Sequence, residues 1–174
     1  VFLGAFVYAV VYTVWLKRRS WLNIVVGGLA GSFAVLAGAA AVAPAHLSAV
    51  PLLFALVLFL WTPPHFWSLA IAYSDDYRNA GVPMLPTVLG DRRAARVVLL
   101  NTVSLVAASL LPAFFGLGWF YLAAALGGGA YFVAKSVALA KLPNRATAMA
   151  NFHASLLQLS LLLLAAVIDR AVFS

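Results

Sequence analysis

The chain has 174 residues, of which 66% are hydrophobic and only 9% are charged, and its mean hydropathy is +1.06. A soluble domain of this size has too little interior to bury so much apolar surface, so the composition excludes a soluble fold and indicates a membrane protein. The eleven Lys and Arg against four acidic residues give a net charge of +7, which in membrane proteins usually reports loop orientation rather than nucleic acid binding. The absence of cysteine excludes structural disulfides, iron–sulfur clusters and thiolate metal sites.

Six apolar runs follow one another, most of them near the roughly 20 residues that a spanning helix needs. They fall at Phe2–Leu16, Leu22–Val42, Val50–Tyr73, Ala95–Leu117, Trp119–Leu142 and Phe152–Val172. The first run is short, and the chain enters it at Val1 without a methionine or the basic front of a signal peptide. We therefore expect an all-α, polytopic transmembrane helical bundle in which residues 1–174 form a single integral membrane domain, part of a longer protein whose N-terminal part is missing here.

The joints between these runs alternate between basic and neutral. The basic joints hold Lys17, Arg18 and Arg19, then Arg78, Arg92, Arg93 and Arg96, and Lys135, Lys141 and Arg145 follow around the end of the fifth run. The joints near Ala43–Ala49 and Leu117–Gly118 contain no Lys or Arg. By the positive-inside rule the basic joints face the cytoplasm, and Asp169–Arg170 lies on the opposite face. This alternation is the pattern that six membrane spans require.

The third run contains the segment Trp61-Thr62-Pro63-Pro64-His65-Phe66-Trp67. Two prolines remove two backbone donors and kink a helix, which membranes tolerate only where protein or water satisfies the freed carbonyls. Since ionisable residues inside spans are usually functional, one interpretation is that the kink opens a pocket that His65 faces. The alternative is a structural kink in which His65 merely caps a carbonyl.

Beyond the prolines, His65, Ser68, Ala72 and Asp76 follow a three-then-four spacing and share one helical stripe of about 16 Å. Such a stripe would hold a lipid-like group with its charged end near Asp76.

Asp75 and Asp76 stand side by side at the predicted cytoplasmic edge. Adjacent carboxylates repel unless a cation bridges them, and Mg²⁺ is commonly held by one or two carboxylates together with substrate phosphates. With Arg78 beside the pair, this pattern suits a diphosphate–Mg²⁺ headgroup whose phosphate oxygens contact arginine. The alternative is a solvated loop pair balanced by local arginines.

The next segment, Ala80–Thr87, is apolar and stiffened by proline, whereas loops are normally polar. It is either a lid over a lipid-facing site or a re-entrant packing segment. Asp91 is interpreted as a helix N-cap rather than a metal ligand. Asn151, Ser155 and Gln158 share a helical face, and we expect them to bridge helices rather than to line a cavity.

Taken in order, these segments resemble the protoheme IX farnesyltransferases, or heme O synthases, a family of UbiA-type intramembrane prenyltransferases. The resemblance covers essentially the whole chain and rests on Tyr12–Arg19, Asn23–Gly28, WTPPHFW and the Asp76-Tyr77 pair followed by AGVPMLP. It implies a nine-helix bundle in the bacterial inner membrane, of which this chain holds the last six helices, the C-terminal two-thirds of the full-length protein, with the Asp75–Pro86 loop in the cytoplasm. The family's first aspartate-rich motif has no counterpart here, so this chain alone is expected to be inactive.

The resemblance also implies an activity in heme biosynthesis: transfer of a farnesyl group from farnesyl diphosphate to the vinyl group of protoheme IX, which makes heme O. By the same resemblance Mg²⁺ is the cofactor, Asp76 and His65 are catalytic, and Asp76 and Asp75 are metal ligands. The diphosphate or propionate groups are expected on Lys17, Arg18, Arg19 and Arg78. The substrate cavity is expected to involve Trp61, Phe66, Trp67, Ser68 and Tyr77.

The partners implied are the two substrates, the lipid bilayer and, as a candidate protein partner, heme A synthase; nucleic acid is not expected. Two other functions stay open. A related prenyltransferase acting on a quinone or chlorophyll precursor would keep the aspartates but has no evident need of the Pro-Pro-His-Phe segment. A non-catalytic channel or membrane subunit would instead carry polar residues along several helices, whereas here they cluster at one face.

Overall fold

The computed structural model describes residues 2–43 and 48–173, and within these ranges it is helical without any strand. Five helices there are long and apolar enough to cross a membrane. They are α2 (Asn23–Val42), α3 (Ala49–Ala72), α6 (Asp91–Leu110) continued by the 3-10 turn η2 (Leu111–Phe115), α7 (Trp119–Lys141) and α8 (Arg145–Phe173). The first apolar run, Phe2–Leu16, is a shorter helix made of α1 (Phe2–Phe6) and the π-helical segment η1 (Val7–Leu16). The predicted helical membrane bundle is therefore confirmed.

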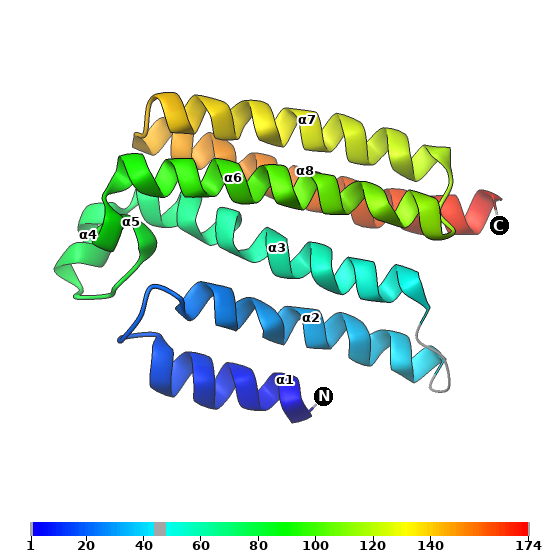
Figure 1. Cartoon of the computed structure of the whole chain (residues 1–174), viewed down its shortest axis with the longest axis horizontal. Coiled ribbons are helices and arrows are strands. Elements are labelled where there is room, and N and C mark those ends of the chain that lie inside the picture. The colour runs from blue at the N-terminus through cyan, green and yellow to red at the C-terminus, as the bar shows by residue number, and fades with distance from the viewer. Residues whose placement is uncertain (1, 44–47, 174) are drawn as a thin grey trace.

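Successive long helices run antiparallel, and α3 occupies the middle of the bundle (Figure 1). It contacts α2 on one side and both α6 and α8 on the other, while α7 packs against α6 and α8. Two short helices, α4 (Ser74–Asn79) and α5 (Leu85–Leu89), lie together at one end of the bundle. Large apolar side chains stay exposed along the helices, as a lipid-facing surface requires.

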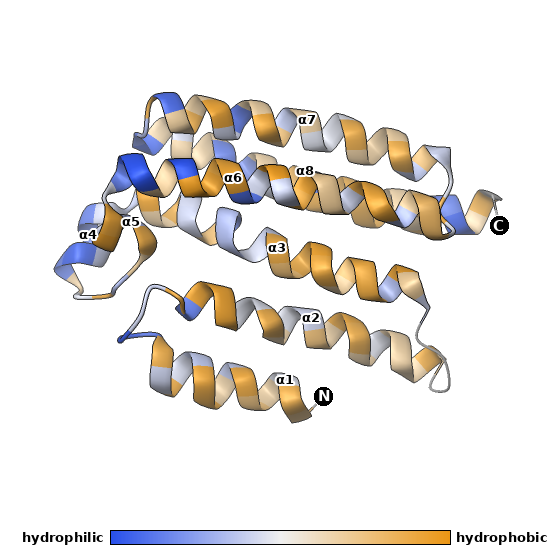
Figure 2. Cartoon of the chain, viewed as in Figure 1, coloured by the Kyte–Doolittle hydropathy of each residue, from blue (hydrophilic) through white to orange (hydrophobic). Residues whose placement is uncertain are grey.

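Hydrophilic residues gather at the end of the bundle that carries α4 (Figure 2). The joint after η1, the start of α6 and the turn between α7 and α8 all lie at this end, so the basic joints share one end as predicted. The neutral joint at 117–118 lies at the other end. Residues 44–47 of the other neutral joint fall outside the described residues.

Helix α3 continues through Pro63 and Pro64 as one element. Proline has no N–H, so Pro64 leaves the carbonyl of Leu60 without its helical partner. The Asn101 side-chain amide, from α6, donates to this oxygen at 3.3 Å. A neighbouring helix thus satisfies the carbonyl that Pro64 frees, as membrane helices require.

Two helices begin earlier than the sequence predicted. Helix α6 begins at Asp91 and its N-cap residue is Gly90 at φ +80°, so the interpretation of Asp91 as N-cap was wrong by one residue. Helix α8 begins at Arg145 rather than Phe152. Asn144 closes its first turn reciprocally with Thr147: Oδ1 accepts from the Thr147 amide at 2.9 Å, and the Asn144 amide donates to Thr147 Oγ1 at 3.2 Å.

Asp169, near the end of α8, caps the start of α7 across the helix interface. Its side chain is 4% exposed, and its two carboxylate oxygens accept hydrogen bonds from the amides of Gly118 at 2.9 Å and Tyr121 at 2.8 Å. Amides at a helix start lack intrahelical partners and favour a negative charge. Both oxygens of the Asp169 carboxylate are therefore used to stabilise the start of α7.

A buried polar chain joins four helices nearer the α4 end. Asn151 Nδ2 donates to Ser68 Oγ at 2.8 Å, and Ser136 Oγ donates to Asn151 Oδ1 at 2.8 Å and lies 3.0 Å from Thr102 Oγ1. These residues come from α8, α3, α7 and α6, so Asn151 bridges helices as predicted. Gln158 is also buried, but neither atom of its amide has a partner in the described part of the chain.

Candidate active site

Helix α3 ends at Ala72 and α4 begins at once with Ser74, which brings Asp75 and Asp76 into a single exposed turn. Asp75 is already neutralised, because Arg78 Nη1 lies 2.6 Å from its Oδ1. The carboxylate of Asp76 has no hydrogen bond or ion pair among the described residues. The two neighbours therefore differ, and Asp76 is the one that is free to bind a ligand.

A polar pocket of about 350 Å³ lies beside Asp76. It contains three of the chain's four acidic residues and is lined by Ile71, Ala72, Tyr73, Ser74, Asp75, Asp76, Asp91, Asn144 and Arg145. An apolar pocket of about 360 Å³ also includes this residue and is lined by Leu69, Tyr73, Asp76, Tyr77, Ala80 and Val82. Asp76 and Tyr73 belong to both, so Asp76 marks the border between a charged and an apolar space.

Within the polar pocket, Asp91 and Ser74 are in contact. Asp91 Oδ2 accepts from Ser74 Oγ at 3.4 Å, while Asp91 Oδ1 is buried without a partner in the described chain. No three acidic or histidine side chains of the described residues come close enough to form a metal cage by themselves. Mg²⁺ usually takes only one or two carboxylates and completes its shell with water and substrate phosphate. The oxygen donors here fit a cation that arrives with a phosphate-bearing substrate.

Arg145 enters the polar pocket from the joint between α7 and α8. Its guanidinium lies over the Tyr73 ring, 4.9 Å from the ring centroid, and Nη2 donates to Tyr73 Oη at 3.4 Å. Sequence reasoning used Arg145 only to orient the chain and did not place it in the site. The sequence did place Arg145 on the same membrane face as Asp76. It could not show that the two residues share a pocket, because that depends on the turn between α7 and α8 packing against the end of α3.

His65 lies in the interface between α3 and α8, away from the pockets that Asp76 lines. Its ring is 7% exposed and is stacked between Trp61 at 4.1 Å and Phe152 at 4.4 Å. Ser155 Oγ donates to the Phe152 carbonyl at 2.6 Å, so His65 Nδ1, 2.7 Å from that oxygen, must donate to it. This leaves the lone pair on Nε2, for which the described residues offer no partner.

The other aromatic candidates are separated by the fold. Tyr77 lines the apolar pocket beside Asp76. Phe66 lines a different pocket, of about 290 Å³, with Tyr8, Tyr12, Ile24, Gly27 and Thr62. Trp61 donates through Nε1 to the Ser155 carbonyl at 2.8 Å, and Trp67, 4% exposed, packs against Trp21. Ser68 belongs to the buried polar chain. Of the five predicted cavity residues, all of which the structure describes, Tyr77 is the one that lines a pocket with Asp76.

The predicted phosphate-binding cations are also divided. Lys17, Arg18 and Arg19 lie in the joint after η1 at the same end of the bundle (Figure 2), but none of them lines either pocket beside Asp76. Arg78 is held by Asp75. Of the basic residues described, Arg145 is the one that lines the polar pocket.

The apolar segment after α4 is partly packed and partly open. Met84, Leu85 and Pro86 are buried, and Thr87 Oγ1 accepts from the Met84 amide at 2.9 Å and donates to its carbonyl at 2.7 Å. Val82 lines the apolar pocket. The segment from Met84 onward thus corresponds to the packing alternative rather than to a lid.

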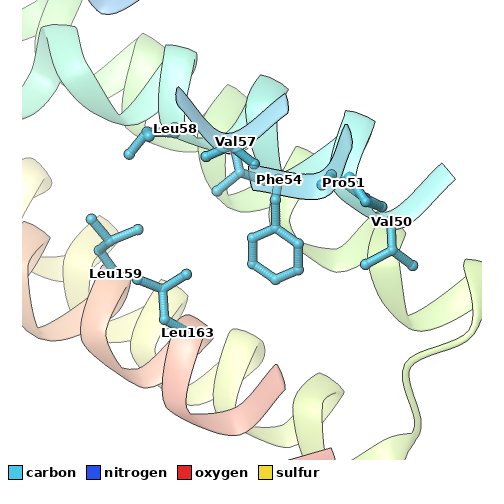
Figure 3. A pocket seen from close by; sticks show the side chains of 9 residues that line it. Val50, Pro51, Phe54, Val57, Leu58, Leu159 and Leu163 are labelled. Atoms are coloured by element: carbon cyan, nitrogen blue, oxygen red, sulfur yellow. The ribbon is translucent and has the colours of Figure 1, made fainter. Parts of the chain in front are cut away.

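A separate apolar cavity of about 310 Å³ lies between α2, α3 and α8, with the Phe54 ring pointing into it (Figure 3). It is lined by Val35, Ala39, Val50, Pro51, Phe54, Val57, Leu58, Leu159 and Leu163. Of its α3 residues, Leu58 lies nearest in sequence to the Asp76 site, and it is still roughly 20 Å along the helix from Ala72 at about 1.5 Å per residue. This cavity belongs to the opposite half of the bundle and not to the site around Asp76.

Comparison with known proteins extends these observations. The model of the UbiA prenyltransferase family matches residues 1–162. The chain is 63% identical over 169 residues to protoheme IX farnesyltransferase 2 of Paramagnetospirillum magneticum, covering 97% of this chain and 58% of the relative. It is 56% identical over 170 residues to protoheme IX farnesyltransferase 1 of the same organism, covering 97% and 60%.

A more distant relative is a protoheme IX farnesyltransferase of Thermus thermophilus, 47% identical over 171 residues, which are 98% of this chain and 28% of that protein. The chain thus spans 58% and 60% of the length of its two Paramagnetospirillum relatives. No solved structure matches it.

Proposed function

The chain belongs to the UbiA prenyltransferase family, and from this premise we propose that the whole protein transfers a farnesyl group from farnesyl diphosphate to a vinyl group of protoheme IX, making heme O. The names of its relatives support the heme substrate. We further propose that it works in the bacterial inner membrane, with the Asp75–Pro86 segment on the cytoplasmic side and heme A synthase as a candidate partner.

One observation carries this proposal: Asp76 lines both a polar pocket and an apolar pocket. Farnesyl diphosphate has the same division, because a charged diphosphate is joined directly to an apolar chain. A substrate with its diphosphate in the polar pocket and the start of its chain against Leu69, Tyr77 and Val82 places the breaking bond beside Asp76.

In the proposed reaction the bond between the allylic carbon and the diphosphate oxygen breaks, and the vinyl carbon of protoheme attacks the allylic cation. Water then adds to the new cation with loss of a proton. Asp76, with Asp75 beside it, would hold Mg²⁺, which neutralises charge on the departing diphosphate when it is bound. The apolar walls around Tyr77 exclude water from the allylic cation.

The remaining assignments are proposals of the same kind. Lys17, Arg18, Arg19 and Arg78 would contact diphosphate or propionate groups once the substrates occupy this end of the bundle. His65 would act through Nε2 on the heme side of the reaction, since Nδ1 is held by Ser155. Trp61 and Phe152 fix the His65 ring by stacking and so define where Nε2 points.

The direct test supplies the whole protein in membranes with farnesyl diphosphate and either protoheme IX or an aromatic acid acceptor, with and without Mg²⁺. We expect heme O to form only with protoheme and only with the divalent cation, and extraction of heme followed by chromatography and mass spectrometry measures it. Prenylation of the aromatic acid without any heme O would refute the heme assignment and favour a quinone-type prenyltransferase.

A further inference from the structure

The polar pocket contains charges of both signs that do not neutralise one another. Asp76 and Asp91 line it without an ion pair, and Arg145 lines it without a carboxylate partner in the described residues. The ion pair that does form, between Arg78 and Asp75, lies within one turn of α4. Opposite charges attract, so the unpaired Asp76, Asp91 and Arg145 are each available to a ligand of matching charge.

Arg145 is held apart by Tyr73. The guanidinium lies over the tyrosine ring at 4.9 Å and contacts its hydroxyl at 3.4 Å. A cation placed over an aromatic face keeps its charge and retains most of its N–H donors. Arg145 also begins α8 directly after Asn144, whose reciprocal hydrogen bonds with Thr147 fix the backbone at this point. The backbone of Arg145 and its guanidinium are therefore both positioned before a ligand arrives.

We propose that Arg145 is an anion-binding residue of the active site, which contacts an oxyanion of a substrate held in the polar pocket opposite Asp76. The inference rests on the proposed function for the location of the substrate and adds a residue to it. The planar guanidinium offers a fork of donors that matches phosphate and carboxylate oxygens alike. The ligand chemistry is thus an oxyanion that either a diphosphate or a heme propionate supplies.

The test measures binding as well as turnover in the whole protein. Arg145→Gln, Arg145→Lys and the control Lys141→Gln are compared, because Lys141 carries the same charge in the same joint but does not line the pocket. Titration calorimetry gives the affinity for inorganic diphosphate with Mg²⁺ and for farnesyl diphosphate with Mg²⁺. Absorption titration of the Soret band gives the affinity for protoheme.

We expect Arg145→Gln to weaken binding of one oxyanion by about 10-fold, the loss of one charge-assisted contact, with Lys141→Gln unchanged. Weaker binding of both diphosphates would assign the site to the diphosphate, and weaker binding of protoheme alone would assign it to a propionate. Arg145→Lys should restore part of the affinity, because it keeps the charge but loses the fork. If the Gln variant did not fold, the Lys variant would decide through the same titrations.

Affinities within twofold of the parent for all three ligands, in a folded variant, would overturn the proposal. This outcome is distinct from failure of the proposed function. If the parent protein made no heme O but bound diphosphate through Arg145, the heme assignment would fall and the role of Arg145 would stand.

Discussion

The two ends of the bundle each contain carboxylates, and they use them in opposite ways. At one end Asp169 is 4% exposed and accepts two backbone amides that start α7. At the other end Asp76 is exposed, has no partner in the described chain, and borders two pockets. A carboxylate with its partners inside the fold stabilises the fold, whereas one without them at a cavity is available to a ligand. The residue type alone did not distinguish the roles of these two aspartates.

The largest effect that would sharpen this contrast is on Asp76. We expect Asp76→Asn in the whole protein to lower the rate of heme O formation on the order of 100-fold, since the amide no longer holds a cation against the developing diphosphate charge. The unfolding temperature in detergent should stay the same, because the side chain makes no contact that the fold needs. Unchanged heme O output would remove Asp76 from the proposed site.

Asp169→Ala should show the reverse pattern. Loss of two charge-assisted hydrogen bonds at the start of α7 is expected to lower the free energy of unfolding by about 2 kcal/mol. The rate per folded molecule should hardly change, because this end of the bundle is remote from Asp76. Asp169→Asn keeps one acceptor and should fall between. A lower rate with unaltered stability would break the comparison of the two ends.

A substitution of His65 tests whether this buried ring takes part in the reaction or only packs between helices. His65→Phe keeps a ring between Trp61 and Phe152 but removes both nitrogens. If Nε2 acts on the heme, the rate of heme O formation should fall by up to about 10-fold, the worth of one neutral hydrogen bond. His65→Gln, which retains polar atoms, should be less impaired than Phe if hydrogen bonding is what counts. A fully active Phe variant would make His65 a packing residue only.

The smallest expected effect concerns Asn101, which belongs to neither end. Asn101→Ala should cost about 1 kcal/mol of stability, because the Leu60 carbonyl freed by Pro64 then loses its donor. In a Pro64→Ala background the backbone itself can supply that donor, so the same Asn101 change should cost much less. Thermal unfolding of the four proteins of this double-mutant cycle measures the difference. Additive effects would contradict the assigned pairing.

Most of the fold followed from run length and charge. The apolar runs predicted every long helix because the bilayer needs a continuous apolar stretch, and the basic joints share one end as the alternation required. The N-cap interpretation of Asp91 put the start of α6 one residue too late, whereas the start of α8 was missed because its first turn is polar and precedes the apolar run. The first turn of α8 depends on the Asn144 and Thr147 hydrogen bonds, which hydropathy does not detect.

The site was less predictable because it is assembled from distant segments. Asp76 and Tyr77 are neighbours in the chain, and both line the apolar pocket. Arg145 and Asp91 reach the same pocket only through the packing of α8 and α6 against α3. The predicted stripe from His65 to Asp76 assumed one uninterrupted helix, but α3 ends at Ala72 and His65 lies against α8. Helical periodicity does not predict such a break or such a partner.

The cap that Asp169 places on α7 has a consequence for how the protein is made. The carboxylate lies almost at the end of α8, so the first amides of α7 have no such partner until α8 has emerged from the ribosome and crossed the bilayer. The two helices are therefore expected to enter the membrane together as a hairpin. A chain released by the translocation machinery after α7 alone would leave the start of that helix uncapped, which makes completion of α8 the step that commits this half of the bundle to its final topology.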